Sequence, residues 1–315
     1  MTDLRASDLR TSLHGLWLPL ITPFRNGALD EVSLRRLVRH YAALPVNGLV
    51  LAATTGESLT LEPRETERLV FTVRNEVGGT RNLPVSLGLS GSNTSALLDT
   101  LDRTAAWPID GYLISCPYYS RPSQHGLELH FGALADRAAH PVMLYNIPYR
   151  TGVNLGNEAM LRLADHPDIV KDCSADRNQS LDLMRRRPQG FAVLTGEDAQ
   201  YYEALIDGAD GGILASAHIE TEMFANIRSL VVAGERDAAL SCWRSVAELT
   251  RLLFSEPSPA PIKYWLWRTG LIDSAEVRPP MTEVSTDLAA RLDREIERRR
   301  EISIADSPRA ARSRS

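Results

Sequence analysis

The sequence predicts an α/β fold: a (β/α)8 TIM barrel followed by a small C-terminal helical appendage. Short apolar runs of strand length alternate eight times with longer amphipathic segments, the pattern of parallel strands joined by helices. After Ala215 only helical segments follow. An open doubly wound sheet is the alternative, but the chain has no glycine-rich strand-to-helix turn of the dinucleotide-binding type.

The apolar runs define the eight predicted strands. They are residues 16–22, 48–53, 84–88, 111–115, 142–146, 169–171, 192–195 and 211–215. Helix-length segments lie between them; in residues 33–44, for example, apolar side chains recur three and four positions apart. Pro63, Asn93 and Ser123 indicate where three of these helices begin.

Four helical segments follow the last predicted strand. They are residues 218–233, 237–254, 262–269 and 287–300. We expect residues 15–233 to form the barrel, with the first of these segments as its eighth helix, and residues 234–300 to form the C-terminal helices. Residues 301–315 are polar and rich in arginine and serine, so we expect a disordered tail.

Composition narrows the functional classes. The 315-residue chain has a net charge of -5 with both signs interspersed, so we expect no nucleic-acid partner. It has neither an apolar run long enough to span a membrane nor the apolar core of a signal peptide, so we expect a cytoplasmic protein without a membrane partner. Cys116, Cys173 and Cys242 are far apart and the histidines are scattered, so we expect no disulfide framework and no metal site.

Lysine usage singles out one residue. Lys171 and Lys263 are the only lysines in a chain whose Lys+Arg total is 35. Arginine stays protonated, whereas a desolvated lysine amine can lose its proton, attack a carbonyl and form a Schiff base. Lys171 ends the sixth predicted strand, where barrel enzymes place their chemistry, and is therefore the candidate nucleophile. The alternative is an ordinary ion-paired lysine. Lys263 follows a proline-marked turn, and we interpret it as structural.

Other strand ends carry polar residues of matching chemistry. Thr54 and Thr55 begin a Thr-Thr-Gly-Glu turn whose backbone N–H groups can converge on a carboxylate. The fifth strand ends in Tyr145 and, on a proline-marked turn, Arg150, which suits a bidentate carboxylate contact. Each feature alone has a structural explanation, such as a tight turn or, for the tyrosine pair ending at Tyr119, packing at an interface. Together they suit a 2-oxo acid substrate.

In these motifs the chain resembles the dihydrodipicolinate synthase/N-acetylneuraminate lyase family of pyruvate-dependent class I aldolases. The resemblance covers residues 15–282. It rests on Thr54-Thr55-Gly56-Glu57, Pro117-Tyr118-Tyr119, Tyr145-Asn146-Ile147-Pro148, Lys171-Asp172, Gly196-Glu197-Asp198 and Pro261-Ile262-Lys263, in the family's order and spacing. It implies an enzyme that needs no metal or organic cofactor, because an imine on the lysine serves as the electron sink.

The resemblance also implies catalytic roles. Lys171 would condense with the keto carbon of pyruvate, and Tyr145 would move protons to and from that centre. Thr54 would link Tyr145 to Tyr119, which in the family's synthases reaches in from a neighbouring subunit. The implied assembly is a homotetramer, built as a dimer of dimers.

Substrate contacts follow from the same resemblance. Thr55 would hold the pyruvate carboxylate, and the backbone around Gly196 and Ile213 would line the pocket. Arg150 discriminates within the family, because the synthase branch uses an arginine there on the carboxylate of aspartate semialdehyde. We therefore expect condensation of pyruvate with L-aspartate 4-semialdehyde to give 4-hydroxy-tetrahydrodipicolinate, in lysine biosynthesis. The alternatives are a 2-keto-3-deoxy sugar acid aldolase of the same family and a catalytically silent keto-acid-binding barrel.

The chain departs from the family's pattern at three places. Ala53 replaces the usual glycine before the Thr-Thr-Gly-Glu turn. Ser92 and Ala96 stand where lysine-sensitive synthases carry an asparagine and a glutamate, so we expect no strong inhibition by lysine. Two residues are missing before Lys171, which shortens the sixth strand by roughly 6–7 Å without changing the face of the side chain. Either residues 166–168 are drawn into the strand, or Lys171 is displaced.

Overall fold

A curled parallel sheet forms the centre of the molecule. The computed structural model describes residues 13–80, 83–164, 171–172 and 176–305. Its eight sheet strands are β1 (Gly15–Pro19), β4 (Gly48–Leu51), β5 (Val85–Leu89), β6 (Gly111–Ser115), β7 (Val142–Tyr145), β8 (Lys171–Asp172), β9 (Ala192–Thr195) and β10 (Gly211–Ile213). The order is β7-β6-β5-β4-β1-β10-β9-β8. The sheet curls so that its two end strands, β7 and β8, also lie close to one another.

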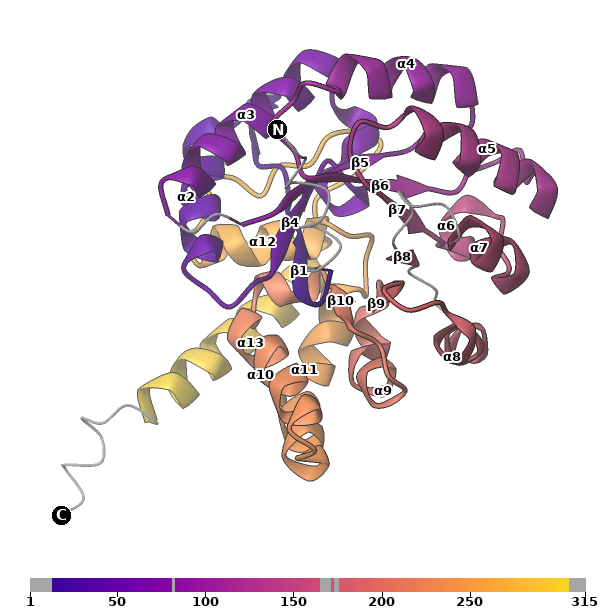
Figure 1. Ribbon diagram of the computed structural model, residues 1–315. Helices are drawn as coiled ribbons and strands as arrows, with labels where there is room; N and C mark the ends of the chain where they lie inside the picture. Colours follow the sequence, from indigo (N-terminus) through magenta and orange to yellow (C-terminus); the bar gives the residue numbers. More distant parts are fainter. Residues whose placement is uncertain (1–12, 81–82, 165–170, 173–175, 306–315) are drawn as a thin grey trace.

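Helices surround the strands on the outside of the sheet (Figure 1). Those up to β10 are α2 (Glu31–Ala42), α3 (Pro63–Gly78), α4 (Thr94–Thr104), α5 (Gln124–Arg137), α6 (Pro148–Thr151), α7 (Asn157–Ala164), α8 (Arg177–Arg186) and α9 (Tyr201–Ile206). They are followed by α10 (Thr221–Val232), α11 (Arg236–Leu253), α12 (Ala260–Arg268) and α13 (Thr286–Ala305). α10 packs against α11, and α12 against α13.

The alternation of side chains along the strands divides the core into two parts. The smaller cluster fills the inside of the curled sheet and consists of Leu13, Trp17, Val50, Ala53, Leu113, Met143, Leu194 and Ile213. The larger cluster contains the strand residues of opposite parity, such as Leu16 and Leu18, and the apolar stripes of the helices. Successive side chains on a strand point to opposite faces, so β1, β4, β6, β7 and β9 each contribute to both clusters.

The signals for the beginnings of helices are confirmed. Pro63 is the first residue of α3. The side chains of Asn93 and Ser123 accept hydrogen bonds from backbone N–H groups in the first turns of α4 and α5. Each cap satisfies donors that have no partner within the helix, and this explains why the helices start at these residues.

Several elements differ from the sequence-based prediction. β1 ends at Pro19 rather than at residue 22, and a short antiparallel hairpin, β2 (Phe24–Arg25) with β3 (Ala28–Leu29), follows it. Gly27 lies in the turn of this hairpin at φ +78, where a side chain would be strained. α13 continues to Ala305, five residues past its expected end, and residues 306–315 lie outside the described part of the chain.

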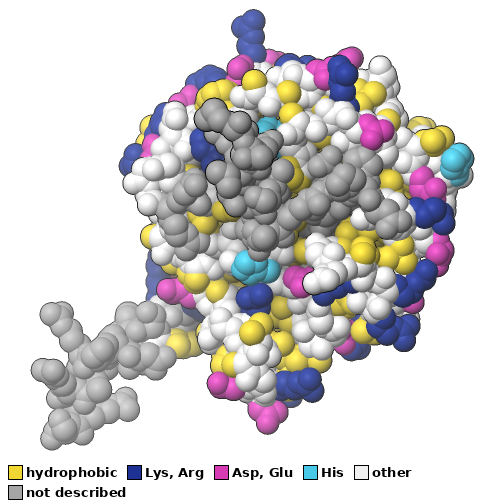
Figure 2. Space-filling view, viewed as in Figure 1, with side chains coloured by type: hydrophobic (Ala, Val, Ile, Leu, Met, Phe, Trp, Pro, Cys, Tyr) yellow, Lys and Arg dark blue, Asp and Glu magenta, His cyan; other side chains and the backbone are white. Residues whose placement is uncertain are grey.

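Charges of both signs are mixed over the face shown in Figure 2, as the sequence composition predicts. Along the described residues, no helix combines the length and apolarity that crossing a bilayer would require.

His218 joins the ends of β1 and β10. Its Nδ1–H donates to the carbonyl of Ala215 at 2.7 Å, and its Nε2 accepts from the N–H of Ile21 at 3.2 Å, so the buried ring is neutral. Burial lowers its pKa to about 4 from an ordinary value of 6.5. The unfolded chain therefore takes up a proton first as the pH falls.

We predict that His218 destabilises the fold between pH 6.5 and 4. The loss of unfolding free energy from this residue should reach about 3 kcal/mol at pH 4. Asp198, whose pKa is raised to about 6, acts in the opposite direction, so the comparison must be between variants. In urea unfolding, lowering the pH from 7 to 4 should cost the wild type about 3 kcal/mol more unfolding free energy than it costs His218→Gln. A variant of the exposed His125 should follow the wild type, and parallel curves for His218→Gln would contradict the prediction.

Candidate active site

Six of the predicted site residues line one small chamber at the carboxyl ends of the strands. Its volume is ≈ 40 Å³. We call this the inner chamber; its lining residues are Pro19, Ala53, Thr54, Thr55, Leu113, Tyr145, Tyr149, Arg150, Gly196, Asp198, Ile213, Ala215, Phe254 and Ser258. The predicted residues come from the ends of β4, β7, β9 and β10, which are far apart in the sequence and meet because parallel strands end at the same rim.

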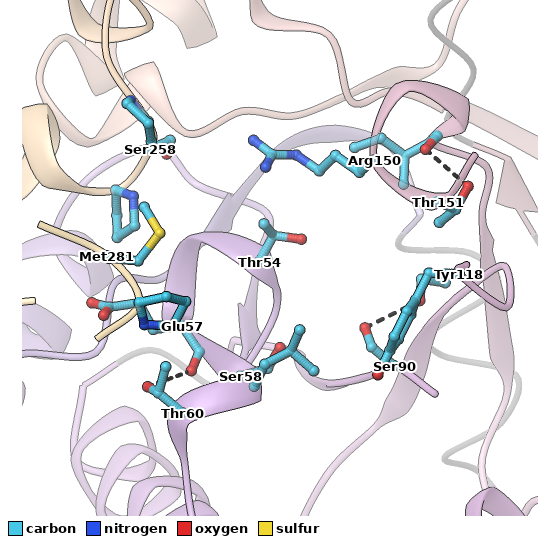
Figure 3. Close-up of a pocket in the computed structure, with 16 residues that line it drawn as sticks. Thr54, Glu57, Ser58, Thr60, Ser90, Tyr118, Arg150, Thr151, Ser258 and Met281 are labelled. Carbon is cyan, nitrogen blue, oxygen red and sulfur yellow. Dashed lines mark hydrogen bonds between the residues drawn. The ribbon is translucent and has the colours of Figure 1, made fainter. Parts of the chain in front are cut away.

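A larger outer cavity of ≈ 340 Å³ adjoins the inner chamber. The two share Thr54, Arg150 and Ser258. The remaining lining residues of the outer cavity are Glu57, Ser58, Leu59, Thr60, Ser90, Ser115, Tyr118, Ile147, Thr151, Pro257, Pro259, Pro280 and Met281. In Figure 3 the Arg150 side chain extends between these walls towards Ser258, with Thr54 beneath it.

The threonine turn begins directly after β4. Thr54–Gly56 form a 3-10 turn, closed by hydrogen bonds from Gly56 N–H to the Ala53 carbonyl and from Glu57 N–H to the Thr54 carbonyl, both 3.0 Å. A Cβ on Gly56 would lie 3.0 Å from the Leu20 carbonyl oxygen, so the close approach of this turn to the end of β1 favours glycine. The turn thereby presents Thr54 and Thr55 to the inner chamber.

Tyr145 and Arg150 are placed by a short buried loop. Tyr145 is the last residue of β7, and Arg150 lies on α6. Asn146, fully buried between them, accepts a hydrogen bond from the Leu155 N–H at 2.9 Å and donates to the Asn154 side chain at 2.8 Å. The guanidinium of Arg150 stacks over the Tyr149 ring at 5.4 Å.

Lys171 lies in β8, next to the strand that carries Tyr145. Its backbone pairs with Ala192, whose side chain packs against the cluster inside the sheet. The Lys171 side chain and residues 165–170 lie outside the described part of the chain. The two alternatives, residues 166–168 drawn into the strand or a displaced Lys171, concern these same residues.

Within a single chain, Tyr119 is not part of either cavity. Its side chain is 94% exposed and its backbone has φ +70, an uncommon conformation for a residue with a side chain. Tyr118, the preceding residue, instead lines the outer cavity, and its carbonyl accepts a hydrogen bond from the Ser92 hydroxyl at 2.6 Å.

Sequence reasoning did not assign Tyr149, Asp198, Phe254 and Ser258 to the site, although they also line the inner chamber. Asp198 was visible only as part of a family motif. Phe254 and Ser258 come from the C-terminal helical region, and the proline-rich segment around Ser258 reads as a helix break. The Ser258 hydroxyl is buried and has no hydrogen-bond partner among the described residues.

Asp198 ties the loop after β9 to the loop after β10. Its Oδ1 accepts hydrogen bonds from the Ser216 backbone N–H at 2.6 Å and from the Ser216 hydroxyl at 2.5 Å. Only 3% of Asp198 is exposed, and burial raises its pKa to about 6 against the lowering effect of these hydrogen bonds.

Among the described residues that line the two cavities, Arg150 is the only basic one. The carboxylate of Glu57 is paired with the buried Lys263, so it does not oppose an incoming anion. Burial raises the pKa of the neighbouring Glu197, while Arg150 lowers it. Across the residues that the structure describes, no group of three or more His, Cys, Asp or Glu could hold a metal ion.

A chamber with a phenol, paired hydroxyls and an arginine, at the strand ends of a curled parallel sheet, defines an α/β enzyme acting on a small carboxylate. The model of the dihydrodipicolinate synthetase family matches residues 12–299, and the chain belongs to this family.

Curated and solved relatives agree with this assignment. The chain is 41% identical over 286 residues to 4-hydroxy-tetrahydrodipicolinate synthase 2 of Clostridium acetobutylicum, covering 90% of this chain and 99% of that one. The crystal structure of dihydrodipicolinate synthase from Thermotoga maritima superimposes with a TM-score of 0.87 at 30% identity, covering 90% and 98% of the two chains. A monomeric dihydrodipicolinate synthase variant gives 0.88 at 30% identity, covering 92% and 98%.

We predict that Asp198→Ala destabilises the protein by about 1–3 kcal/mol, because it leaves two buried Ser216 donors without an acceptor. Asp198→Asn should lose less, since its amide oxygen can accept the same bonds. Denaturant unfolding at pH 7 measures both. Asp102→Ala, which removes an exposed ion pair with Arg137, is the control and should cost less than about 1 kcal/mol. Equal losses for Asp198→Ala and Asp102→Ala would contradict a stabilising role of the Asp198–Ser216 hydrogen bonds.

Proposed function

We propose that the protein is a class I pyruvate-dependent lyase that condenses pyruvate with L-aspartate 4-semialdehyde to give 4-hydroxy-tetrahydrodipicolinate, in lysine biosynthesis. The observation that carries the proposal is the inner chamber, where Tyr145, Thr54, Thr55 and Arg150 meet in a chain of this family. The names of the curated relatives support the same reaction.

The chemistry begins on Lys171. Its neutral amine adds to the keto carbon of pyruvate, and water leaves to give an imine. The imine withdraws electrons, so the adjacent methyl carbon loses a proton and an enamine forms. The enamine carbon attacks the aldehyde carbon, and the aldehyde oxygen takes up a proton. The amino group of the aldehyde substrate then attacks the imine carbon, which closes the ring and releases Lys171. Tyr145 carries protons in these steps, with Thr54 beside it.

Two carboxylates are held at different places. Thr55 and the N–H groups of its turn hold the pyruvate carboxylate, with the backbone at Gly196 and Ile213 as the opposite wall. Arg150, shared by the inner chamber and the outer cavity, pairs with the carboxylate of the aldehyde. Ser258 lines both cavities, and its buried hydroxyl has no hydrogen-bond partner among the described residues.

The architecture completes this proposal. We infer that β7 and β8 close the sheet into a (β/α)8 barrel within residues 15–233, with residues 234–300 as the C-terminal helical unit. The working assembly is a homotetramer in which Tyr119 of a neighbouring subunit reaches towards Thr54. The exposure and uncommon backbone conformation of Tyr119 support a role at an interface. We also propose that the protein works in the cytoplasm.

One observation favours a second candidate, a 2-keto-3-deoxy sugar acid aldolase. Hydroxyl side chains line much of the outer cavity and could bind a polyol chain: Ser58, Thr60, Ser90, Ser115 and Thr151. Arg150 counts against this candidate, because a neutral polyol chain offers it no charge to pair with.

Borohydride trapping with pyruvate tests the Schiff base. We expect one reduced pyruvate adduct per chain, located on Lys171 by peptide mass spectrometry. The other lysine, Lys263, is a built-in control, since its side chain is fully buried and ion-paired. A folded protein that stays unmodified would instead favour the catalytically silent barrel, and an adduct on Lys263 would refute the assignment of the nucleophile.

Arg150→Ala tests the choice of aldehyde. We predict that kcat/KM for aspartate semialdehyde falls about 10- to 100-fold, the value of a charge-assisted carboxylate contact, while pyruvate trapping is unchanged. Arg150→Lys keeps the charge but not the bidentate geometry and should be intermediate. If the alanine variant keeps its aspartate semialdehyde activity, or the wild type cleaves a 2-keto-3-deoxy sugar acid faster, the sugar acid aldolase is favoured.

A further inference from the structure

The side chain of Glu57 is buried where three distant segments meet. Only 1% of it is exposed. Its Oε1 pairs with the Nζ of Lys263 on α12, and its Oε2 accepts the backbone N–H of Arg278 at 2.9 Å. Both carboxylate oxygens are therefore engaged by the C-terminal part of the chain, more than 200 residues away in sequence.

The C-terminal partners are themselves held firmly. The Lys263 Nζ also donates to the Glu276 carbonyl at 2.8 Å and lies 4.2 Å from the centre of the Phe24 ring. The Arg278 guanidinium lies 4.1 Å from the same ring, pairs with Glu65 and donates to the Thr60 carbonyl at 2.9 Å. The two cations thus enclose Phe24 and fix the position of the Glu57 carboxylate.

The backbone of Glu57 closes the substrate-facing turn. It has φ +54, and its N–H donates to the Thr54 carbonyl at 3.0 Å. Its own carbonyl accepts the N–H and the hydroxyl of Thr60, both at 2.9 Å. A residue with a side chain adopts this left-handed conformation only at a cost, so the surrounding contacts must hold it there.

We propose that the buried Glu57–Lys263 pair is a positioning device that sets the geometry of the Thr54-Thr55-Gly56 turn for binding of the pyruvate carboxylate. The inference rests on the proposed function for its ligand. On this proposal the C-terminal helices take part in forming the active site, because α12 carries Lys263, whose amine pairs with Glu57 on the side of the turn that faces away from the cavity. Lys263 touches no substrate; it acts through Glu57.

Stability and positioning can be separated, because a buried ion pair responds differently to single and double substitution. Removing one partner leaves an uncompensated buried charge, whereas removing both can be neutral or stabilising. Glu57→Gln and Lys263→Met should each lower the melting temperature, and the double variant should recover much of the loss. Recovery of the fold does not restore the ionic anchor of the turn.

The experiment measures pyruvate saturation of borohydride trapping at Lys171 and amide hydrogen exchange in residues 53–58. In the double variant we expect a half-saturating pyruvate concentration about 10- to 100-fold above the wild-type value, together with faster exchange at Gly56 and Glu57. Asp293→Asn is the matched control. It weakens the more exposed pair between Arg268 of α12 and Asp293 of α13, which does not contact Glu57, and should leave both measurements at wild-type values.

The inference is overturned if the double variant folds and keeps both the wild-type half-saturating pyruvate concentration and the wild-type amide exchange rates at Gly56 and Glu57. If the wild-type protein traps no pyruvate, the proposed function fails, and the exchange rates alone then decide whether the pair holds the turn. Glu57→Asp, which keeps the charge on a shorter side chain, should lie between the wild type and Glu57→Gln in both measurements.

Discussion

The packing inside the curled sheet is the constraint on which the site depends. Trp17 lies at the centre of this packing with no exposed surface. A Cβ on Gly48 of the neighbouring strand would lie only 2.4 Å from the Trp17 ring, so the ring fits because that position has no side chain. The upper residues of the same cluster, Ala53, Leu113 and Ile213, also line the inner chamber. The apolar wall of the inner chamber is therefore part of the core itself, and it is rigid because the interior is closely packed.

At this apolar wall, charge is limited to a few groups. Arg150 faces the space that both cavities share. Glu57 and Lys263 neutralise one another behind the wall, and Oδ1 of the buried Asp198 accepts two hydrogen bonds from Ser216. Among the described lining residues, an anionic substrate therefore meets Arg150 as the accessible cation. A charge-assisted contact is stronger than a neutral hydrogen bond, so the position of Arg150 determines where a carboxylate can bind.

The C-terminal helices contribute to both features. They deliver Phe254 and Ser258 to the inner chamber, and Lys263 and Arg278 to the back of the threonine turn. The sequence shows these residues only as parts of helices and proline-rich breaks. Their arrival at the site depends on packing between segments far apart in the chain, for which local sequence patterns carry no signal.

How much could be predicted differs between elements for physical reasons. Seven strands were predicted within a few residues, because buried parallel strands are short apolar runs bounded by turns. Helix starts at Pro63, Asn93 and Ser123 were predictable because caps act locally. The hairpin β2–β3 was missed, since two-residue strands have almost no periodicity. Thr54, Thr55, Tyr145 and Arg150, predicted as site residues, line one chamber because each lies at or soon after the end of a recognisable strand.

By itself, the sequence determined the class of fold, the rim at which the chemistry gathers, and Lys171 as the candidate nucleophile. All of these follow from local periodicity and from side-chain chemistry. Only the tertiary structure decided that Arg150 stands between two cavities, that Asp198 ties two loops together, and that Lys263 neutralises Glu57. Such contacts join residues separated by tens to hundreds of positions, and they exist only once packing has brought the segments together.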